Sequence, residues 1–314
     1  PVPPARPAPR SEGLNADGRF APSPTGELHL GSLRTALLAW LFARAAGARF
    51  LVRIEDLDPD RVREHYVRSQ LDDLRAIGLD WDDEPVRQST RLHLYAEALA
   101  ELESHGLVYR CFCSRREIRE AASAQHGEQP ELLYPGTCAK LSQEESDRRA
   151  AEGAEFALRL RAEGREVEIE DRLHGPVSRP VDDFVLRRRD GAFAYNLAVV
   201  VDDHDQGIGE VVRGDDLLDS TPRQALLYDL LGLPRPGWAH VPLVLGPDGT
   251  RLAKRHGAVT LRELAPDGDA APVVSQLAVS LGLAEAGERV SAQDLLARFD
   301  PARLPREPTV IDPS

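Results

Sequence analysis

The chain has 314 residues and a formal net charge of −13, and 42% of its residues are hydrophobic. These values are ordinary for a globular protein with one large or two modest domains. The acidic balance argues against a general nucleic-acid coat, because phosphate binding requires cationic surface, although a local arginine-rich face could still bind RNA. No stretch reaches the roughly 18 apolar residues of a membrane span, so we expect no membrane partner.

The N-terminus and the cysteines indicate the cellular setting. Residues 1–17 are rich in proline and contain no apolar core like that of a signal peptide, which predicts a disordered lead-in. Three cysteines in a chain of this size do not form a disulfide framework. We therefore expect a reducing, cytoplasmic setting, and we expect the protein to be a monomer.

A strand–loop–helix–strand pattern opens the folded chain. Residues 18–21 and 48–54 are predicted strands, the second apolar nearly throughout, as in a parallel sheet. The helix between them carries apolar residues on one face, namely Leu33, Ala36, Leu37, Trp40 and Leu41. This βαβ unit predicts an open α/β sheet, which binds ligands beyond the carboxyl ends of its strands.

The remaining chain is predicted to contain an insertion and a second α/β half. One helix carries Tyr95, Leu99 and Leu102 on one face, and a later helix begins with Thr221 as its cap. An acidic run at 201–207 is interpreted as a solvated turn rather than a metal site. The predicted organisation is a lead-in (1–17), a first α/β half (18–109), an insertion (110–190), a second α/β half (191–257) and a short helical extension (258–314).

Residues 20–32, "FAPSPTGELHLGS", place turn residues and one histidine directly before a helix. The prolines hold the backbone open, and Gly26 and Gly31 let it approach a ligand closely. The helix directs its free N–H groups and the positive end of its dipole at this loop, where His29 could hydrogen-bond a phosphate. Taken alone, an H-x-G sequence more often marks a capped turn with a surface histidine.

Two further segments favour a ligand site over a capped turn. Arg19 precedes the loop and Glu55 ends the next strand, so together they could bind a carboxylate and an amine; the alternative is a pair of rim charges. Only Lys140 and Lys254 are lysines among 39 basic residues. Lys254 lies in the segment "RLAKRHG", where an ammonium group suits the stabilisation of phosphate charge, and the alternative is a solvated loop.

The segments "FAPSPTGELHLGSLRTALLAWL" and "VRIEDLDPDR" closely resemble the catalytic domain of class I glutamyl-tRNA synthetases. Residues 29–32 match the HIGH motif of that family, and residues 251–255 lie where its KMSKS motif would, usually K-L-S-K-R. Arg251 and Ala253 depart from that pattern, and Ala253 removes a hydroxyl, but Lys254 remains and we still expect catalysis. The resemblance covers most of the chain and implies a Rossmann-type α/β catalytic domain.

The resemblance also implies which residues bind the substrates. Glu55 would hold the α-amino group of L-glutamate, and His29 and Lys254 would stabilise phosphate charge on ATP, which binds with magnesium, as pyrophosphate leaves. Two arginines suit the two carboxylates of glutamate, in an order left open. The implied ATP site comprises His29, Gly31, Ser32 and Lys254, and the implied glutamate site comprises Arg19, Phe20, Ala21, Pro22, Ser23, Glu55, Tyr195 and Arg213.

The segment after the KMSKS-like motif indicates a branch of this family. Residues 258–314 cannot supply the helical anticodon-binding region of a full glutamyl-tRNA synthetase, so we expect a catalytic domain with no anticodon-binding domain. The chain resembles the shortened paralogues, the glutamyl-queuosine tRNA(Asp) synthetases. That resemblance implies activation of glutamate without tRNA, followed by transfer to queuosine at the wobble position of the tRNA(Asp) anticodon stem-loop.

Other functions stay open from the sequence. The chain could charge a tRNA 3′ end, as a glutamyl-tRNA synthetase does. It could also be an inactive paralogue that binds tRNA or an amino acid, an alternative motivated by Ala253. Cysteine ligases and pantothenate synthetase share a HIGH-type fold, but they would not need the combination of Arg19, Glu55 and Arg213.

All three cysteines, Cys111, Cys113 and Cys138, lie in the predicted insertion, and three thiolates with one further ligand make a tetrahedral zinc site. The residues alone leave His126 and Tyr134 as candidates for the fourth ligand, and three unrelated buried thiols are the alternative. The spacing C-x-C…Y-x3-C is similar to the zinc site of the shortened paralogues. This similarity implies Tyr134 as a ligand and one structural zinc ion.

Overall fold

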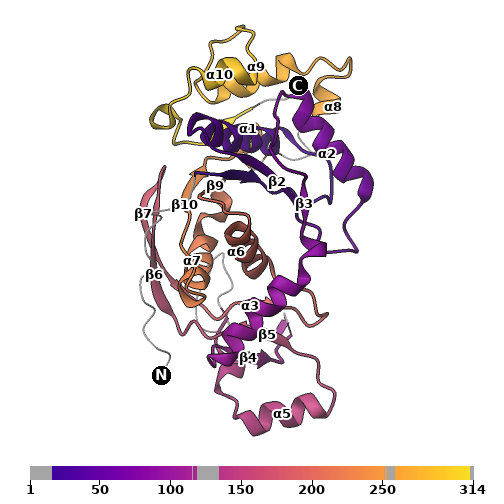
Figure 1. Cartoon of the computed structure of the whole chain (residues 1–314), viewed down its shortest axis with the longest axis vertical. Helices are drawn as coiled ribbons and strands as arrows, with labels where there is room; N and C mark the ends of the chain where they lie inside the picture. Colours follow the sequence, from indigo (N-terminus) through magenta and orange to yellow (C-terminus); the bar gives the residue numbers. More distant parts are fainter. Residues whose placement is uncertain (1–15, 115, 119–133, 251, 253–258, 312–314) are drawn as a thin grey trace.

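The computed structural model describes residues 16–311 except 115, 119–133, 251 and 253–258 (Figure 1). The first part contains β1 (Gly18–Phe20), α1 (Leu30–Ala45), β2 (Phe50–Ile54), α2 (Glu64–Ala76), β3 (Val86–Arg87) and α3 (Leu92–Ser104). The middle contains β4 (Val108–Cys111), α5 (Gln143–Ala151), β5 (Ala157–Leu160), β6 (Arg165–Asp171), β7 (Gly175–Val181) and β8 (Val185–Arg187). The last part contains α6 (Tyr195–Asp205), β9 (Glu210–Gly214), α7 (Thr221–Leu230), β10 (Gly237–Val241), β11 (Val244–Leu245), α8 (Leu261–Leu264), α9 (Ala271–Ser280), α10 (Ala292–Leu296) and β12 (Thr309–Val310).

The strands of both halves meet in one layer. β1, β2 and β3 form a parallel sheet, with α1 connecting β1 to β2, and a second sheet has the order β7-β6-β10-β9. The two sheets meet where the Asp17 carbonyl accepts hydrogen bonds from the backbone N–H groups of Gly209 (2.9 Å) and Glu210 (3.2 Å). The predicted open α/β sheet is confirmed. The predicted lead-in is one residue too long, because Asp17 is buried and belongs to the folded chain.

Helices cover both faces of this layer. In Figure 1, α1 and the C-terminal helices lie on one side of β2, β9 and β10, and α6 and α7 lie on the other. Side chains alternate accordingly along β2: Phe50, Val52 and Ile54 pack in the core with α1, whereas Leu51 packs with α6 and α7. Burial on both faces explains why β2 is apolar at four of its five positions.

The segment predicted as an insertion divides between two sheets. β4, β5 and β8 form a separate antiparallel sheet, and α5 lies beyond it in Figure 1. β6 and β7 form an antiparallel hairpin that joins the main sheet, because β6 pairs in parallel with β10 at Asp171 and Trp238. Val167 and Ile169 on β6 pack in the core with α6 and α7. The hairpin therefore extends the main sheet rather than standing apart from it.

A buried arginine on α1 attaches the C-terminal segment. Arg34 is 2% exposed, and it donates to the carbonyl oxygens of Pro242 (2.6 Å) and Ser280 (3.4 Å). The predicted short helices are present as α8, α9 and α10. The sequence did not predict β12, which pairs in parallel with β11, because a two-residue strand leaves no periodic pattern.

Two other predicted helices are present. Tyr95, Leu99 and Leu102 are the buried residues of α3, as their spacing indicated. α7 begins one residue earlier than predicted, since Ser220 is its N-cap and Thr221 is its first helical residue. Within the described residues, no helix is both long and apolar enough to cross a membrane.

Candidate active site

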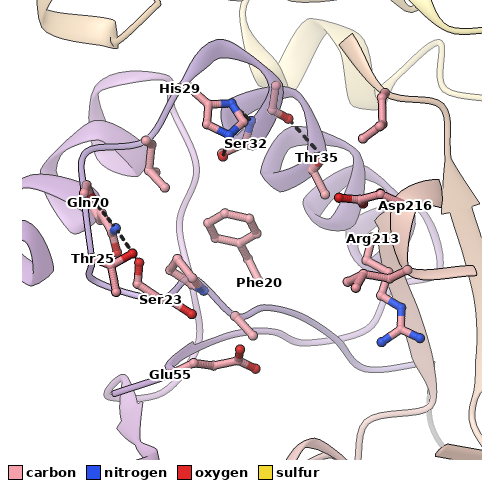
Figure 2. A pocket seen from close by; sticks show the side chains of 18 of the residues that line it. Phe20, Ser23, Thr25, His29, Ser32, Thr35, Glu55, Gln70, Arg213 and Asp216 are labelled. Carbon is pink, nitrogen blue, oxygen red and sulfur yellow. Dashed lines mark hydrogen bonds between the residues drawn. The ribbon is translucent and has the colours of Figure 1, made fainter. Parts of the chain in front are cut away.

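An open cavity of about 550 Å³ lies where β1, β2 and β9 end and α1 begins (Figure 2). The loop before α1 and the end of β2 both line it, which places the two predicted segments at the carboxyl edge of the sheet. Of the residues predicted to bind glutamate, all except Arg19 line the cavity. The lining includes Phe20, Ala21, Pro22, Ser23, His29, Gly31, Ser32, Glu55, Tyr195 and Arg213.

His29 is the N-cap of α1. Its Nδ1 accepts a hydrogen bond from the backbone N–H of Ser32 (3.1 Å), and its Nε2 lies 3.0 Å from the Ser32 hydroxyl. Because Nδ1 is an acceptor, the neutral ring carries its proton on Nε2. A Cβ at Gly31 would lie 3.2 Å from two atoms of the His29 ring, so a glycine keeps the ring in place. His29 is thus a helix cap that also lines the cavity.

Residues on both sides of Lys254, the lysine of the KMSKS-like motif, are hydrogen-bonded beside this loop. On one side, the backbone N–H of Leu252 donates to the carbonyl oxygen of Val244 (3.0 Å), a residue of the cavity wall. On the other side, the carbonyl oxygen of Val259 accepts a hydrogen bond from the backbone N–H of Leu30 (2.7 Å). Lys254 and the two residues that depart from the motif lie outside the described residues, so the role of Lys254 stays a prediction.

The open loop before α1 is held by a side chain that the sequence did not single out. Gln70 on α2 is buried, and its amide nitrogen donates to the carbonyl oxygens of Ser23 (3.2 Å) and Gly26 (2.7 Å). Figure 2 shows Gln70 beside Thr25 at the cavity wall. Local sequence gives no signal for this contact, because Gln70 is one polar position of an amphipathic helix, 44 residues from Gly26.

Glu55 follows β2 and points into the cavity from the lower edge of Figure 2. Its side chain is 11% exposed, and Oε1 lies 3.6 Å from Nη2 of Arg53. Burial raises the pKa of Glu55 to about 7, against the opposing effects of Arg53 and Arg19. The carboxylate form is therefore costly in the free protein, and a cationic ligand would stabilise it.

Arg19 is directed toward α6 rather than the cavity. It is 3% exposed, and its Nε donates to Asp203 Oδ1 (3.0 Å). Arg53 donates to the same oxygen (2.7 Å) and lies 3.7 Å from Asp202. The prediction of a solvated turn at 201–207 is wrong, because both aspartates are buried within α6. The carboxylate that Arg19 meets in this structure belongs to the protein, and its part in glutamate binding stays a prediction.

Arg213 is the arginine of the predicted site that reaches the cavity. It lies on β9 and is 5% exposed, and its Nη1 donates to the Tyr195 hydroxyl (3.3 Å). Its Nε donates to His240 Nε2 (3.0 Å), and its Nη2 donates to Thr221 Oγ1 (2.7 Å). The cavity thus contains an acid, Glu55, and a cation from a distant segment. This combination suits a ligand that carries both an ammonium group and a carboxylate.

The family model described as tRNA synthetases class I (E and Q), catalytic domain, matches residues 16–312. The chain belongs to this family. Glutamyl-Q tRNA(Asp) synthetase of Nocardia farcinica is 60% identical to it over 299 residues, which cover 95% of this chain and 94% of that protein. Glutamyl-Q tRNA(Asp) synthetase of Symbiobacterium thermophilum is 50% identical over 307 residues, which cover 94% of this chain and 95% of that protein.

The fold is also similar to a solved structure of this family. The crystal structure of a glutamate tRNA ligase from Elizabethkingia meningosepticum in complex with its amino acid matches with a TM-score of 0.81 and 27% sequence identity. The match covers 94% of this chain and 67% of the other. These findings confirm the predicted resemblance, and they identify the chain as a ligase with the α/β catalytic fold of class I synthetases.

A second cluster of candidate ligands in this synthetase lies next to β4. The Sγ atoms of Cys111, Cys113 and Cys138 all lie within 4.8 Å of one another. The Tyr134 hydroxyl lies 3.4 Å from Cys111 Sγ and 3.6 Å from Cys113 Sγ. Sulfur ligands of a tetrahedral zinc ion, each about 2.3 Å from the metal, lie roughly 3.8 Å apart, so this donor set fits a zinc ion. His126, the alternative fourth ligand, lies outside the described residues.

We expect the purified synthetase to contain about one zinc ion per chain by elemental analysis, as for a closed tetrahedral site. Tyr134→Phe should weaken zinc retention against a chelator about a hundredfold, because about 10–16 kcal/mol of binding free energy is shared by four ligands. His126→Ala is the matched control and should retain zinc. A stable protein without metal, or zinc loss in His126→Ala alone, would contradict this ligand set.

Proposed function

We propose that this synthetase activates L-glutamate with ATP in the absence of tRNA and then transfers the glutamyl group from the adenylate to queuosine at the wobble position of tRNA(Asp), with AMP as the leaving group. The observation that carries the proposal is the single cavity in which the His29 loop, Glu55 and Arg213 converge. The names of the two similar proteins support the choice of acceptor. The partners would be L-glutamate, ATP with magnesium and the anticodon stem-loop of that tRNA, and we propose a cytoplasmic monomer.

The proposed first step is an in-line displacement at phosphorus. An α-carboxylate oxygen of glutamate attacks the α-phosphorus of ATP and forms a new P–O bond, while the bond to the β-phosphate breaks and pyrophosphate leaves. This step requires positioning and charge stabilisation rather than a protein nucleophile. The Nε2–H group of His29 would donate a hydrogen bond to a phosphate oxygen bound beside Gly31 and Ser32, at the N-terminus of α1. Lys254 would stabilise the charge on the departing pyrophosphate.

The other end of the cavity would bind the amino acid. Glu55 would pair with the α-ammonium group, and Arg213 would pair with a carboxylate. A ligand with only one of these charges would leave the other group of the cavity without a partner on the ligand, so the pair favours a free amino acid. The surrounding wall would consist of Phe20, Ala21, Pro22, Ser23 and Tyr195.

A structural zinc ion is a further part of the proposal. Cys111, Cys113, Tyr134 and Cys138 would hold it, and the bound ion would join β4 to the segment that precedes α5. None of these four residues lines the cavity described above. We therefore assign the ion no step of the reaction.

A second candidate function is the charging of a tRNA 3′ end with glutamate. The similarity in fold to a glutamate tRNA ligase favours it. Both functions need the same adenylate, so the cavity does not separate them. The need for tRNA during activation and the identity of the acceptor do separate them.

Glutamate-dependent ATP–pyrophosphate exchange without tRNA is the assay that decides between these functions. We expect exchange with L-glutamate alone, and we expect labelled glutamate to reach tRNA(Asp) only when that tRNA contains queuosine. Exchange that begins only after tRNA(Glu) is added would favour 3′ charging. Absence of exchange under both conditions would favour an inactive paralogue.

Lys254→Ala should lower the rate of adenylate formation by about a hundredfold or more while leaving glutamate binding nearly intact, because it removes charge stabilisation from the leaving group. Lys140 is the other lysine of the chain and is exposed, so Lys140→Ala is the matched control and should keep the wild-type rate. Single-turnover kinetics and glutamate titration measure the two effects. A wild-type rate in Lys254→Ala would disprove the assignment of this motif.

Glutamate affinity should depend on the ionisation of Glu55. Burial raises its pKa to about 7, so below that pH the free protein holds a neutral acid, whereas the α-ammonium group requires the carboxylate. The dissociation constant should therefore fall by up to about tenfold per pH unit as the pH rises toward 7, and it should level off above it. Titration calorimetry can follow this slope. Glu55→Gln should bind weakly with a flat profile, and an unchanged slope in that variant would refute the assignment.

A further inference from the structure

Arg213 is held by a chain of buried hydrogen bonds that crosses three neighbouring strands. Asp171 ends β6, His240 lies in β10, and Arg213 on β9 is the direct register partner of His240. Asp171 and His240 are 1% and 0% exposed, and Asp171 Oδ2 lies 2.7 Å from His240 Nδ1. On the far side of the ring, Nε2 lies 3.0 Å from Arg213 Nε. Neither Asp171 nor His240 lines the cavity. Nε2 also lies 3.0 Å from Thr221 Oγ1, and of these two contacts of the ring, Arg213 is the one that lines the cavity.

The hydrogen bonds around Asp171 determine where the His240 ring carries its proton. Asp171 Oδ1 accepts from the backbone N–H groups of Leu173 (2.9 Å) and His174 (3.0 Å), and Oδ2 accepts from the backbone N–H of His240 (3.1 Å). Burial opposes the carboxylate, but hydrogen bonds from His240 and these N–H groups hold the pKa of Asp171 below its usual value. Burial lowers the pKa of His240, so its ring is neutral near pH 7. The ionised carboxylate accepts a hydrogen bond from Nδ1–H, so the ring carries its proton on Nδ1 and Nε2 is an acceptor.

A guanidinium has five N–H groups, and the described residues accept three of those of Arg213. Nε donates to His240 Nε2. One Nη1–H donates to the Tyr195 hydroxyl, and one Nη2–H donates to Thr221 Oγ1. Thr221 in turn donates its own proton to the carbonyl oxygen of Leu217 (3.0 Å). One N–H group therefore remains on each terminal nitrogen, which is the pair that a carboxylate can accept in bidentate geometry.

We propose that Asp171 and His240 are positioning residues for the glutamate site. Asp171 fixes the tautomer of His240, and His240 Nε2 fixes the guanidinium of Arg213 so that two N–H groups remain for the substrate carboxylate. A proton on Nε2 would be donated to Thr221 Oγ1, which lies 3.0 Å away, and would leave the Nε–H of Arg213 without this acceptor. The inference rests on the proposed function, in which Arg213 binds glutamate.

Substitutions at His240 separate the orientation of Arg213 from packing. His240→Asn keeps a donor for Asp171 at the position of Nδ1 but places no acceptor beside Arg213, whereas His240→Gln reaches the position of Nε2 with an amide oxygen. In the exchange assay with the full chain, His240→Asn should raise the KM for glutamate about 10- to 100-fold and leave the KM for ATP unchanged. His240→Gln should recover most of this loss. His174→Asn is the matched control, since the His174 ring bonds the backbone of His240 and not Arg213.

Asp171→Asn tests the tautomer directly. Its amide oxygen would stay with the N–H groups of Leu173 and His174, because the reverse orientation would place the NH2 group against these two donors rather than against the one backbone N–H of His240. The NH2 group would then donate to His240 Nδ1, and the ring would carry its proton on Nε2. Nitrogen-15 NMR of histidine-labelled protein should show His240 protonated at Nδ1 in the wild type and at Nε2 in the variant. The KM for glutamate should rise about 10- to 100-fold in Asp171→Asn, although Asp171 does not line the cavity.

The outcomes separate this inference from the proposed function. A wild-type His240 ring protonated at Nε2 would overturn the inference, and so would an unchanged KM for glutamate in a His240→Asn protein that unfolds at the wild-type temperature. If His240→Asn does not fold, the KM of Asp171→Asn decides in the same way. A wild type without glutamate-dependent exchange would overturn the proposed function, and the tautomer would then decide the inference alone.

Discussion

A fully buried guanidinium, that of Arg53, lies between β2 and α6, and the centre of the domain is arranged to balance its charge. Asp203 lies 2.7 Å from it and Asp202 lies 3.7 Å from it. Breaking a buried ion pair of this kind costs about 3–5 kcal/mol, because the remaining charge has lost its hydration. α6 therefore cannot slide along the sheet without a large penalty. The same two aspartates also bind Arg19 from β1 and Arg91 from the start of α3, so one buried charge cluster fixes four segments relative to one another.

This cluster also sets the electrostatics of the adjoining cavity. Glu55 lies two residues beyond Arg53, and its carboxylate is favoured by Arg53 and Arg19 but opposed by Asp203 and Asp202. The opposing charges leave burial as the largest effect, which raises the pKa of Glu55 to about 7. A buried carboxyl group has lost the hydration that stabilises its ionised form. A cation bound beside it therefore stabilises the carboxylate more than it would stabilise an exposed, hydrated one. The cluster thus makes Glu55 a more selective partner for an ammonium group than an exposed glutamate would be.

The sequence predicts those parts of the fold and site that short-range patterns control. Helical periodicity predicted the buried residues of α3, and the turn residues and His29 predicted the loop at the cavity. The acidic run of α6 has the composition of a solvated turn, so the sequence predicts one. Its burial depends on arginines at sequence separations of 111 and 150, which local composition does not reveal. Asp171 and His240 gave no signal for the same reason, since each is ordinary alone and 69 residues separate them. The β6–β7 hairpin was placed in an insertion because sheet membership is set by pairing with β10, not by the hairpin's own residues.

The loop before α1 shows how a structural role and a chemical role can require the same atoms. As the N-cap, His29 accepts the Ser32 N–H at Nδ1, which obliges the neutral ring to carry its proton on Nε2. A phosphate oxygen requires a donor, and Nε2–H is that donor. In this structure the Nε2 proton faces the Ser32 hydroxyl, 3.0 Å away. If a phosphate oxygen accepted this proton instead, the Ser32 hydroxyl could donate a hydrogen bond to the phosphate as well. Phosphate binding would therefore need no change of tautomer, because the bond that begins the helix already selects the donor that the proposed chemistry uses.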